Sequence, residues 1–368
     1  MKQTNLKLGN ETLEFDFISF IRFPLIVGVV FIHAWLFKVN GTNLFDYHYF
    51  HGTPIVSNSL YPWYTCFAHL FSQIIPRISV PLFFFISGFL FFKNMESFSM
   101  SLYKQKLRKR VRTLLVPYVF WNVLAVLIYM AKKEIAGADY ELNITDWILA
   151  FWDFKGMYTP ACLPLWFIRD LMVLTVLTPF IFKAIKMLRG YVLVILTACW
   201  LSLFWIHLFE LNCISVYFFT LGAYASIKRV DFIEFAHKYA SWGKWVFLST
   251  AIGILYFMDR DWSVYLLNLN ILAGLVCCMD GVSTLLKSKK CRVNHFLESS
   301  TFFVFAFHII LLDILSDWLG SISIPASDWL LTLIYVAIPS FTVAASVLLY
   351  YLLQKTVPGI TRIITGGR

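Results

Sequence analysis

The chain has 368 residues, of which 59% are hydrophobic, 18% are aromatic and only 14% are charged, whereas soluble domains carry about 25% charged residues. This composition excludes an ordinary water-soluble globule. The 31 Lys and Arg residues exceed the 21 Asp and Glu residues to give a net charge of +10, a surplus that would suit a nucleic-acid partner unless its position along the chain explains it otherwise.

Apolar blocks of roughly 20 residues, the length that crosses a ~30 Å hydrocarbon core, recur along the chain. We therefore expect an all-α, polytopic transmembrane bundle of about ten spans, forming one domain over residues 1–354 with a short tail at 355–368. The polar stretch between the seventh and eighth spans also fits a short hairpin. The expected spans are residues 16–37, 72–92, 114–131, 164–182, 191–208, 213–227, 245–258, 263–279, 296–316 and 328–353.

The basic residues are distributed unevenly between the two sides of this bundle. With the N-terminus placed in the cytoplasm, 23 Lys and Arg residues fall on the inner side and 5 on the outer side. This imbalance follows the positive-inside rule, so both termini are expected to be cytoplasmic. The surplus charge then indicates a lipid bilayer around the protein and no nucleic-acid partner.

The basic run at residues 104–112 lies on the inner side, between the second and third spans. It has two interpretations. It either serves topology and contact with anionic lipid headgroups, or it also attracts a polyanionic cytosolic ligand such as a nucleotide-bearing cosubstrate.

The longest outer segments, about 38–71 and 132–163, are rich in Tyr, Trp, Asn and His. Such segments suit a carbohydrate that stacks on aromatic rings, or equally an aromatic belt at the membrane interface. The seven cysteines show no metal-ligand spacing, so no metal site is expected. Cys66 and Cys162 both fall in outer segments, which leaves a disulfide as an alternative.

Ionisable residues inside the expected spans mark candidate functional positions, because charge is costly in a bilayer. Arg22 and His33 are eleven residues apart in the first span, so they share one helix face and are separated by about 16 Å along the axis. An arginine suits phosphate and a histidine suits abstraction of a hydroxyl proton. Asp16 fits a position at the helix start, where an acid favours the helix dipole.

The second span begins with Arg77 between two prolines, Pro76 and Pro81, and continues to Ser87 and Gly88. The prolines predict a bent helix, and Gly88 also allows close helix packing.

Two later spans carry further ionisable residues. His308 lies in the middle of the ninth span, and Glu298 lies near its cytoplasmic start. Arg169 and Asp170 are adjacent in the fourth span, and because neighbouring helical residues point about 100° apart, we expect them to contact different neighbours and not each other.

Together these elements resemble the acyltransferase type 3 family of membrane acyltransferases, over about residues 14–315. Thr301 and Phe305 stand where the family usually has Ser and Tyr, and the esterase-like domain that some members carry is not expected here. The resemblance rests on Asp16, the Arg22–His33 spacing, residues 77–89, the basic run that ends at Arg112 with residues 115–118, residues 164–167, and the helix that carries His308.

The resemblance implies transfer of an acyl group, acetyl in the first place, from cytoplasmic acyl-CoA to a sugar hydroxyl of a surface or exported glycan, in the cytoplasmic membrane of a bacterium. Acyl-CoA is then a cosubstrate, and no bound cofactor is expected. The site residues would be His33 as general base or transient acyl carrier, Arg22 and Arg112 as donor-binding residues, and a shared cavity lining of Arg77, Ser87, Trp166, Glu298 and His308. Within this lining, Arg77, Ser87 and His308 would position the thioester or stabilise its developing oxyanion.

A transporter or flippase for a glycolipid or small metabolite is the alternative. Multiple spans, intramembrane charges and broken helices favour it. The lack of two-half symmetry and the basic run at residues 104–112 oppose it.

Overall fold

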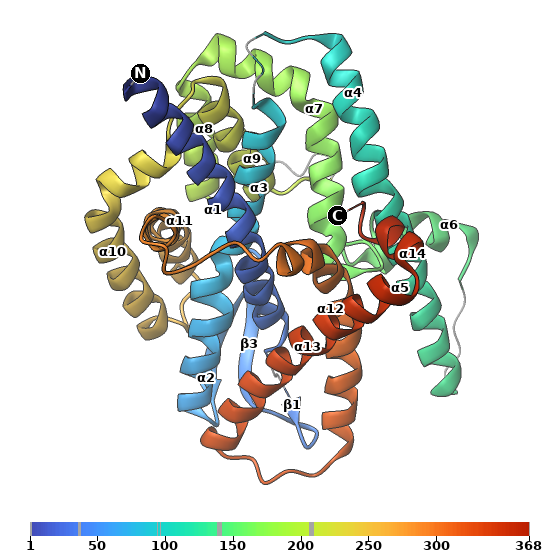
Figure 1. The fold of residues 1–368 in the computed structure, drawn as a ribbon. Helices are drawn as coiled ribbons and strands as arrows, with labels where there is room; N and C mark the ends of the chain where they lie inside the picture. Colours follow the sequence, from blue (N-terminus) through green and yellow to red (C-terminus); the bar gives the residue numbers. More distant parts are fainter. Residues whose placement is uncertain are drawn as a thin grey trace.

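A computed structural model describes residues 2–35, 38–93, 95, 97–137, 142–205 and 210–367, with side chains from Thr12 onward. Long helices run between two ends of the molecule (Figure 1). The N-terminus and helix α4 (Met100–Arg110) lie at one end, and the β-strands lie at the opposite end.

Seven helical segments of the described chain are long and apolar enough to cross a membrane, by length and composition. They contain α1 (Lys2–His33), α2 (Pro62–His69) joined to α3 (Ser79–Phe92), α4 joined to α5 (Val116–Ile135), α7 (Trp166–Leu188), α11 (Ser263–Lys287), α12 (His295–Ser321) and α13 (Asp328–Thr356).

The remaining expected spans also coincide with helices, but the count of ten spans is not confirmed. These helices are α8 (Tyr191–Leu201), α9 (Cys213–Ile227) and α10 (Phe232–Tyr256). With 11 residues, α8 is about 16 Å long and does not reach across a ~30 Å hydrocarbon core. Helices α10 and α11 pack along each other as the antiparallel hairpin that the polar stretch between them indicates.

Helix α1 begins well before the expected span. It starts at Lys2, so Asp16 lies inside the helix with an exposed side chain. The interpretation of Asp16 as a residue at the helix start is therefore wrong.

The bend predicted in the second span is confirmed near its start. Between α2 and α3 the chain forms a π-helix, η1 (Leu70–Ile74), and then a 3-10 turn, η2 (Ile75–Ile78). Pro76 has no N–H to donate, which favours such an interruption. A second π-helix, η3 (Val111–Leu115), joins α4 to α5.

Helices α3 and α9 touch through two glycines. A Cβ atom at Gly88 would overlap the carbonyl of Phe219, and one at Gly222 would overlap the carbonyl of Phe85. The two backbones approach each other closely only because these side chains are absent. This contact fixes α3, which carries Ser87.

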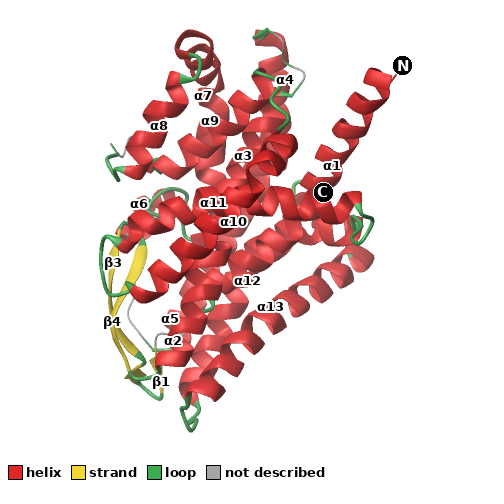
Figure 2. Ribbon diagram, turned by 90° about the vertical axis from the view of Figure 1, so that its left-hand side faces the viewer, coloured by secondary structure: helices red, strands yellow, loops and turns green. Residues whose placement is uncertain are grey.

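The outer segment 38–59 forms two β-hairpins, which the all-α expectation did not include. They are β1 (Lys38–Val39) with β2 (Thr42–Asn43), and β3 (Phe45–Phe50) with β4 (Thr53–Ser59). The second hairpin lies along one side of the helices (Figure 2). His48 contacts Asp261 at 2.6 Å, which ties the hairpin to the connection between α10 and α11.

The remaining elements are short. The 3-10 turns η4 (Phe154–Gly156) and η5 (Leu163–Leu165) follow α6 (Ile144–Leu149). The C-terminal α14 (Pro358–Ile364) packs on α5, where the Trp121 indole donates to the carbonyl of Ile364 at 2.9 Å.

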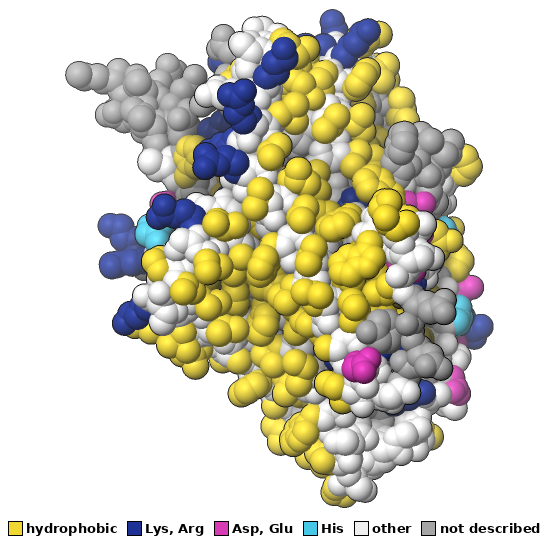
Figure 3. Space-filling model, turned by 90° about the vertical axis from the view of Figure 1, so that its right-hand side faces the viewer, with side chains coloured by type: hydrophobic (Ala, Val, Ile, Leu, Met, Phe, Trp, Pro, Cys, Tyr) yellow, Lys and Arg dark blue, Asp and Glu magenta, His cyan; other side chains and the backbone are white. Residues whose placement is uncertain are grey.

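The exposed surface agrees with a membrane-embedded bundle. Hydrophobic side chains cover one broad face, and many Lys and Arg side chains lie at its upper end and along its left edge (Figure 3). An exposed apolar surface of this extent requires a nonpolar surrounding.

All seven cysteines are free, so the Cys66–Cys162 disulfide does not form.

Candidate active site

A cavity of about 130 Å³ lies among α1, α3, α7, α12 and the junction of α4 with α5. Its lining is mostly apolar and includes Phe83, Phe302 and Phe305. The polar lining consists of Arg22, Ser87, Arg110 and Thr301.

Arg22 is held at the cavity by an ion pair. Its Nη1 lies 2.8 Å from Glu298 Oε1 at the start of α12. The second oxygen of Glu298 lies 3.2 Å from His295 Nδ1. Glu298 therefore orients Arg22 and offsets part of its charge, although it does not itself line the cavity.

Arg110 brings a second guanidinium to the same cavity, within electrostatic range of Arg22. No carboxylate of the described residues pairs with Arg110. Two like charges at one cavity repel each other unless an anion lies between them. Guanidinium groups bind phosphate oxygens through paired hydrogen bonds, so this end of the cavity suits a phosphate-bearing ligand.

One face of the basic run at residues 104–112 is turned into the molecule, and the other is exposed. Lys106 donates to the carbonyl of Phe91, and Arg110, one turn further, faces the cavity. Arg112, the predicted donor-binding residue, is exposed and does not line the cavity. The helical period of Lys106, Arg110 and buried Leu114 could have indicated Arg110 from the sequence.

Of the two cavity residues predicted on α3 and α7, the one on α3 lines the cavity and the one on α7 does not. Ser87 lines the cavity. Trp166 does not, because its ring lies against Phe84 with centroids 6.4 Å apart. Its neighbours Phe167 and Ile168 line the cavity in its place.

The two predicted histidines meet just beyond this cavity. The ring centroids of His33 and His308 are 5.4 Å apart. The last cavity-lining residues on the two helices are Val29 and Phe305, each about one turn before the histidine on its helix. The stripe on α1 that begins at Arg22 thus lines the cavity and leads to His33.

The hydrogen bonding of His308 fixes which of its nitrogens is protonated. Its Nδ1 lies 3.2 Å from the carbonyl of Val304, and a carbonyl only accepts, so Nδ1 donates. In the neutral ring Nε2 then carries the lone pair. Nε2 is buried and has no hydrogen-bond partner in the described part of the chain.

Arg77 lies with the histidines and not with Ser87. It donates to the Gln73 side chain and to the carbonyl of Gly52 in the β3–β4 turn, the latter at 3.4 Å. Its charge acts on both His33 and His69. The expected single cavity is therefore two neighbouring groups, one with Arg22 and Ser87 and one with His33, Arg77 and His308.

His69 is a member of the second group that the sequence did not reveal. It is 2% exposed, and its ring centroid lies 5.4 Å from that of Trp35. The predicted second span began at residue 72 and left His69 in an outer loop. The structure continues the helix back to Pro62, which places His69 inside the bundle.

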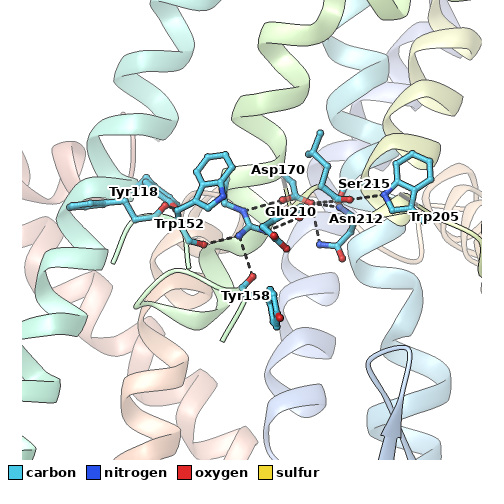
Figure 4. A network of polar contacts seen from close by, with 11 residues as sticks. Tyr118, Trp152, Tyr158, Asp170, Trp205, Glu210, Asn212 and Ser215 are labelled. Atoms are coloured by element: carbon cyan, nitrogen blue, oxygen red, sulfur yellow. Dashed lines mark hydrogen bonds and ion pairs between the residues drawn. The ribbon is translucent and has the colours of Figure 1, made fainter. Parts of the chain in front are cut away.

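Arg169 and Asp170 do contact each other, at 3.2 Å, contrary to the expectation from helix geometry. They are 2% and 0% exposed. They also bind further partners, and Figure 4 shows how the network joins several segments. Arg169 donates to the carbonyls of Trp152, Tyr158 and Glu210, and Asp170 accepts from Asn212 and Ser215.

Comparisons with known proteins show which family the chain belongs to. The chain is 25% identical over 368 residues to the succinoglycan biosynthesis protein ExoH of Rhizobium meliloti (strain 1021), and the match covers 95% of this chain and 92% of that protein. No solved structure matches the chain. A family model described as an acyltransferase domain matches residues 15–351. The chain therefore belongs to the acyltransferase type 3 family.

Proposed function

We propose that this protein transfers an acyl group, acetyl in the first place, from cytoplasmic acyl-CoA to a sugar hydroxyl of a surface or exported glycan. The observation that supports it is the order of groups along α1: Arg22 lines a cavity that Arg110 shares, and His33, one turn beyond the last lining residue Val29, lies beside His308. Family membership supplies acyl transfer, and the relative named for succinoglycan biosynthesis supports a glycan acceptor.

The arginines suit the donor. Arg22, oriented by Glu298, and Arg110 would hold phosphate oxygens of acyl-CoA, with Arg112 adding long-range attraction from the surface. The apolar cavity wall would receive the pantetheine arm. The hydroxyl of Ser87 would donate a hydrogen bond to the thioester carbonyl.

His33 would carry out the chemical step. As a general base it would take the proton of the acceptor hydroxyl as the oxygen attacks the acyl carbon and the carbon–sulfur bond breaks. The proton then passes to the departing thiolate to give the free thiol. As an acyl carrier, its ring nitrogen would first attack the acyl carbon while the carbon–sulfur bond breaks and the thiolate leaves. The acceptor hydroxyl would then take the acyl group as the nitrogen–acyl bond breaks, and its proton would pass to the thiolate.

With this function, we expect the end that carries α4 to face the cytoplasm across a bacterial cytoplasmic membrane. Both chain termini would lie on that side. The concentration of Lys and Arg in the expected inner segments supports that orientation. The donor arginines then lie nearer the cytoplasm than the histidines do, because α1 runs from Arg22 to His33 away from that side.

Mass spectrometry of surface glycans from cells with and without this protein tests the proposal. We expect the glycan to lose a mass equal to one acyl group per modified site, 42 Da for acetyl, when the protein is absent. Unchanged glycan masses, together with counterflow of a solute by the purified protein, would instead support the transporter alternative.

A further inference from the structure

Three buried nitrogen atoms in the group around Arg77 and His308 lack a hydrogen-bond partner in the described part of the chain. They are Nδ1 of His69, Nε of Arg77 and Nε2 of His308. The His69 and His308 side chains are 2% and 0% exposed. Buried polar atoms are paired in the great majority of cases, so a group of three in one region indicates a missing partner.

The three atoms belong to one site. The Arg77 guanidinium acts electrostatically on both His33 and His69, and the ring of His33 lies beside that of His308. We call His69, Arg77 and His308 the outer cluster. His33 and Arg77 keep some accessible surface, whereas the two other histidines are enclosed.

The outer cluster is separate from the donor cavity. None of its three residues lines that cavity. The carbonyl of Gly52, in the turn between β3 and β4, accepts from Arg77. Arg77 therefore joins the cluster to the second hairpin.

We propose that the outer cluster binds the acceptor sugar, with one hydroxyl group donating to His308 and neighbouring hydroxyl groups contacting His69 and Arg77. This inference rests on the proposed function, because it names the part of the site that receives the acceptor. It places a reacting hydroxyl within the reach of His33 while the donor enters from the opposite side.

The hydrogen-bond polarity of the cluster selects the class of ligand. His308 presents a lone pair, because its Nδ1 donates to the carbonyl of Val304. A carboxylate, a thioester carbonyl or an oxyanion offers only lone pairs in return, and so cannot bond to that nitrogen. Hydroxyl groups both donate and accept, so a sugar can satisfy His308 and Arg77 at the same time.

This polarity changes the role expected for His308. In the sequence-based hypothesis His308 and Arg77 position the thioester or stabilise its oxyanion. With Nε2 as an acceptor, neutral His308 serves the acceptor hydroxyl and not the donor carbonyl. His69, which precedes Arg77 in the sequence, becomes a further binding residue for the same sugar.

Two single substitutions, His69→Phe and His308→Phe, test the inference in purified protein. The donor is radiolabelled acetyl-CoA, and the acceptor is glycan isolated from cells that lack the protein. We expect each substitution to raise the KM for glycan about tenfold, the effect of losing one hydrogen bond of ~1.4 kcal/mol. The KM for acetyl-CoA should stay unchanged.

Thermal unfolding separates this role from a structural one. His69→Phe removes a buried nitrogen that has no partner, and in His308→Phe the Val304 carbonyl keeps its helix hydrogen bond when Nδ1 is lost. We therefore expect melting temperatures close to that of the wild type. If either Phe variant melts earlier, His69→Gln and His308→Gln keep a polar atom, and the same KM comparison applies to them. His237→Phe is the matched control, because His237 is exposed on α10 and pairs with Asp280.

The outcomes are distinct from those that test acyl transfer itself. Absence of label in the glycan with the wild-type protein would contradict the proposed function. Normal wild-type transfer, with an unchanged glycan KM in folded His69 and His308 variants, would overturn only the outer cluster as the acceptor site. A rise confined to the KM for acetyl-CoA would also overturn it.

Discussion

The imidazole rings of His33 and His308 lie with their centroids 5.4 Å apart, although one comes from the first helix and the other from the twelfth. Helices α1 and α12 pack against each other along the cavity, and the Arg22–Glu298 ion pair joins the same two helices nearer the N-terminal end of α1. The two helices therefore carry the Arg22–Glu298 pair proposed for donor binding nearer their N-terminal ends, and the histidines proposed for the acyl-transfer site further along.

Arg110→Ala should weaken donor binding. Loss of a charge-assisted hydrogen bond to phosphate costs about 1.5–3 kcal/mol, which corresponds to a rise of roughly 10- to 100-fold in the KM for acetyl-CoA. Steady-state kinetics of the purified protein measure it. Arg112→Ala is the matched control, since Arg112 is an exposed cation two residues away in the same basic run.

If Arg110 contacts the donor phosphates and Arg112 does not, the two variants must differ in their KM for acetyl-CoA. If Arg110→Ala and Arg112→Ala change the KM equally, the basic run acts only as a diffuse positive surface. Repeating the measurement at higher salt adds a check, because screening weakens exposed charges more than enclosed ones.

Gly222→Ala should destabilise the bundle at the contact between α3 and α9. The added methyl group would overlap the backbone carbonyl of Phe85, and overpacking of this kind costs about 1–3 kcal/mol. We expect a lower melting temperature in detergent. In Gly281→Ala, where an added Cβ meets nothing within 4 Å, the melting temperature should stay the same or rise. Equal melting temperatures for the two variants would contradict the close helix contact.

Asp170→Ala should be severely destabilising. It leaves the Arg169 guanidinium, 2% exposed, without its carboxylate, and breaking a buried pair costs about 3–5 kcal/mol. Asp313→Ala is the comparison, because Asp313 is exposed and lies 3.5 Å from Lys132, where an ion pair contributes little. Denaturant titration of both variants measures the difference. A small loss for Asp170→Ala would mean that Arg169 is satisfied by backbone carbonyls alone.

The sequence was most informative where a single helix carries the signal. The spacing of Arg22 and His33 predicted a shared stripe, and the structure lines the cavity with that face of α1. The pair of prolines around Arg77 predicted the broken helix that the structure contains. Both predictions depend only on local geometry.

Features that depend on contacts between distant segments could not be predicted in this way. The β3–β4 hairpin is held by residues beyond α10, such as Asp261, and short polar strands have no strong local pattern. His69 was missed because the second span was predicted to begin at residue 72. In the structure the helix begins at Pro62, and α2 packs against α13. Arg110 was hidden in a basic run whose overall charge is explained by topology.

If His33 is the base or the acyl carrier for transfer from acyl-CoA to a glycan, its removal must stop turnover. Wild-type protein and His33→Ala, reconstituted in lipid nanodiscs, receive radiolabelled acetyl-CoA and glycan from cells that lack the protein. With His237→Ala as control, we predict that His33→Ala lowers kcat by at least about 100-fold and leaves the KM for acetyl-CoA unchanged. Wild-type turnover by His33→Ala would contradict the account.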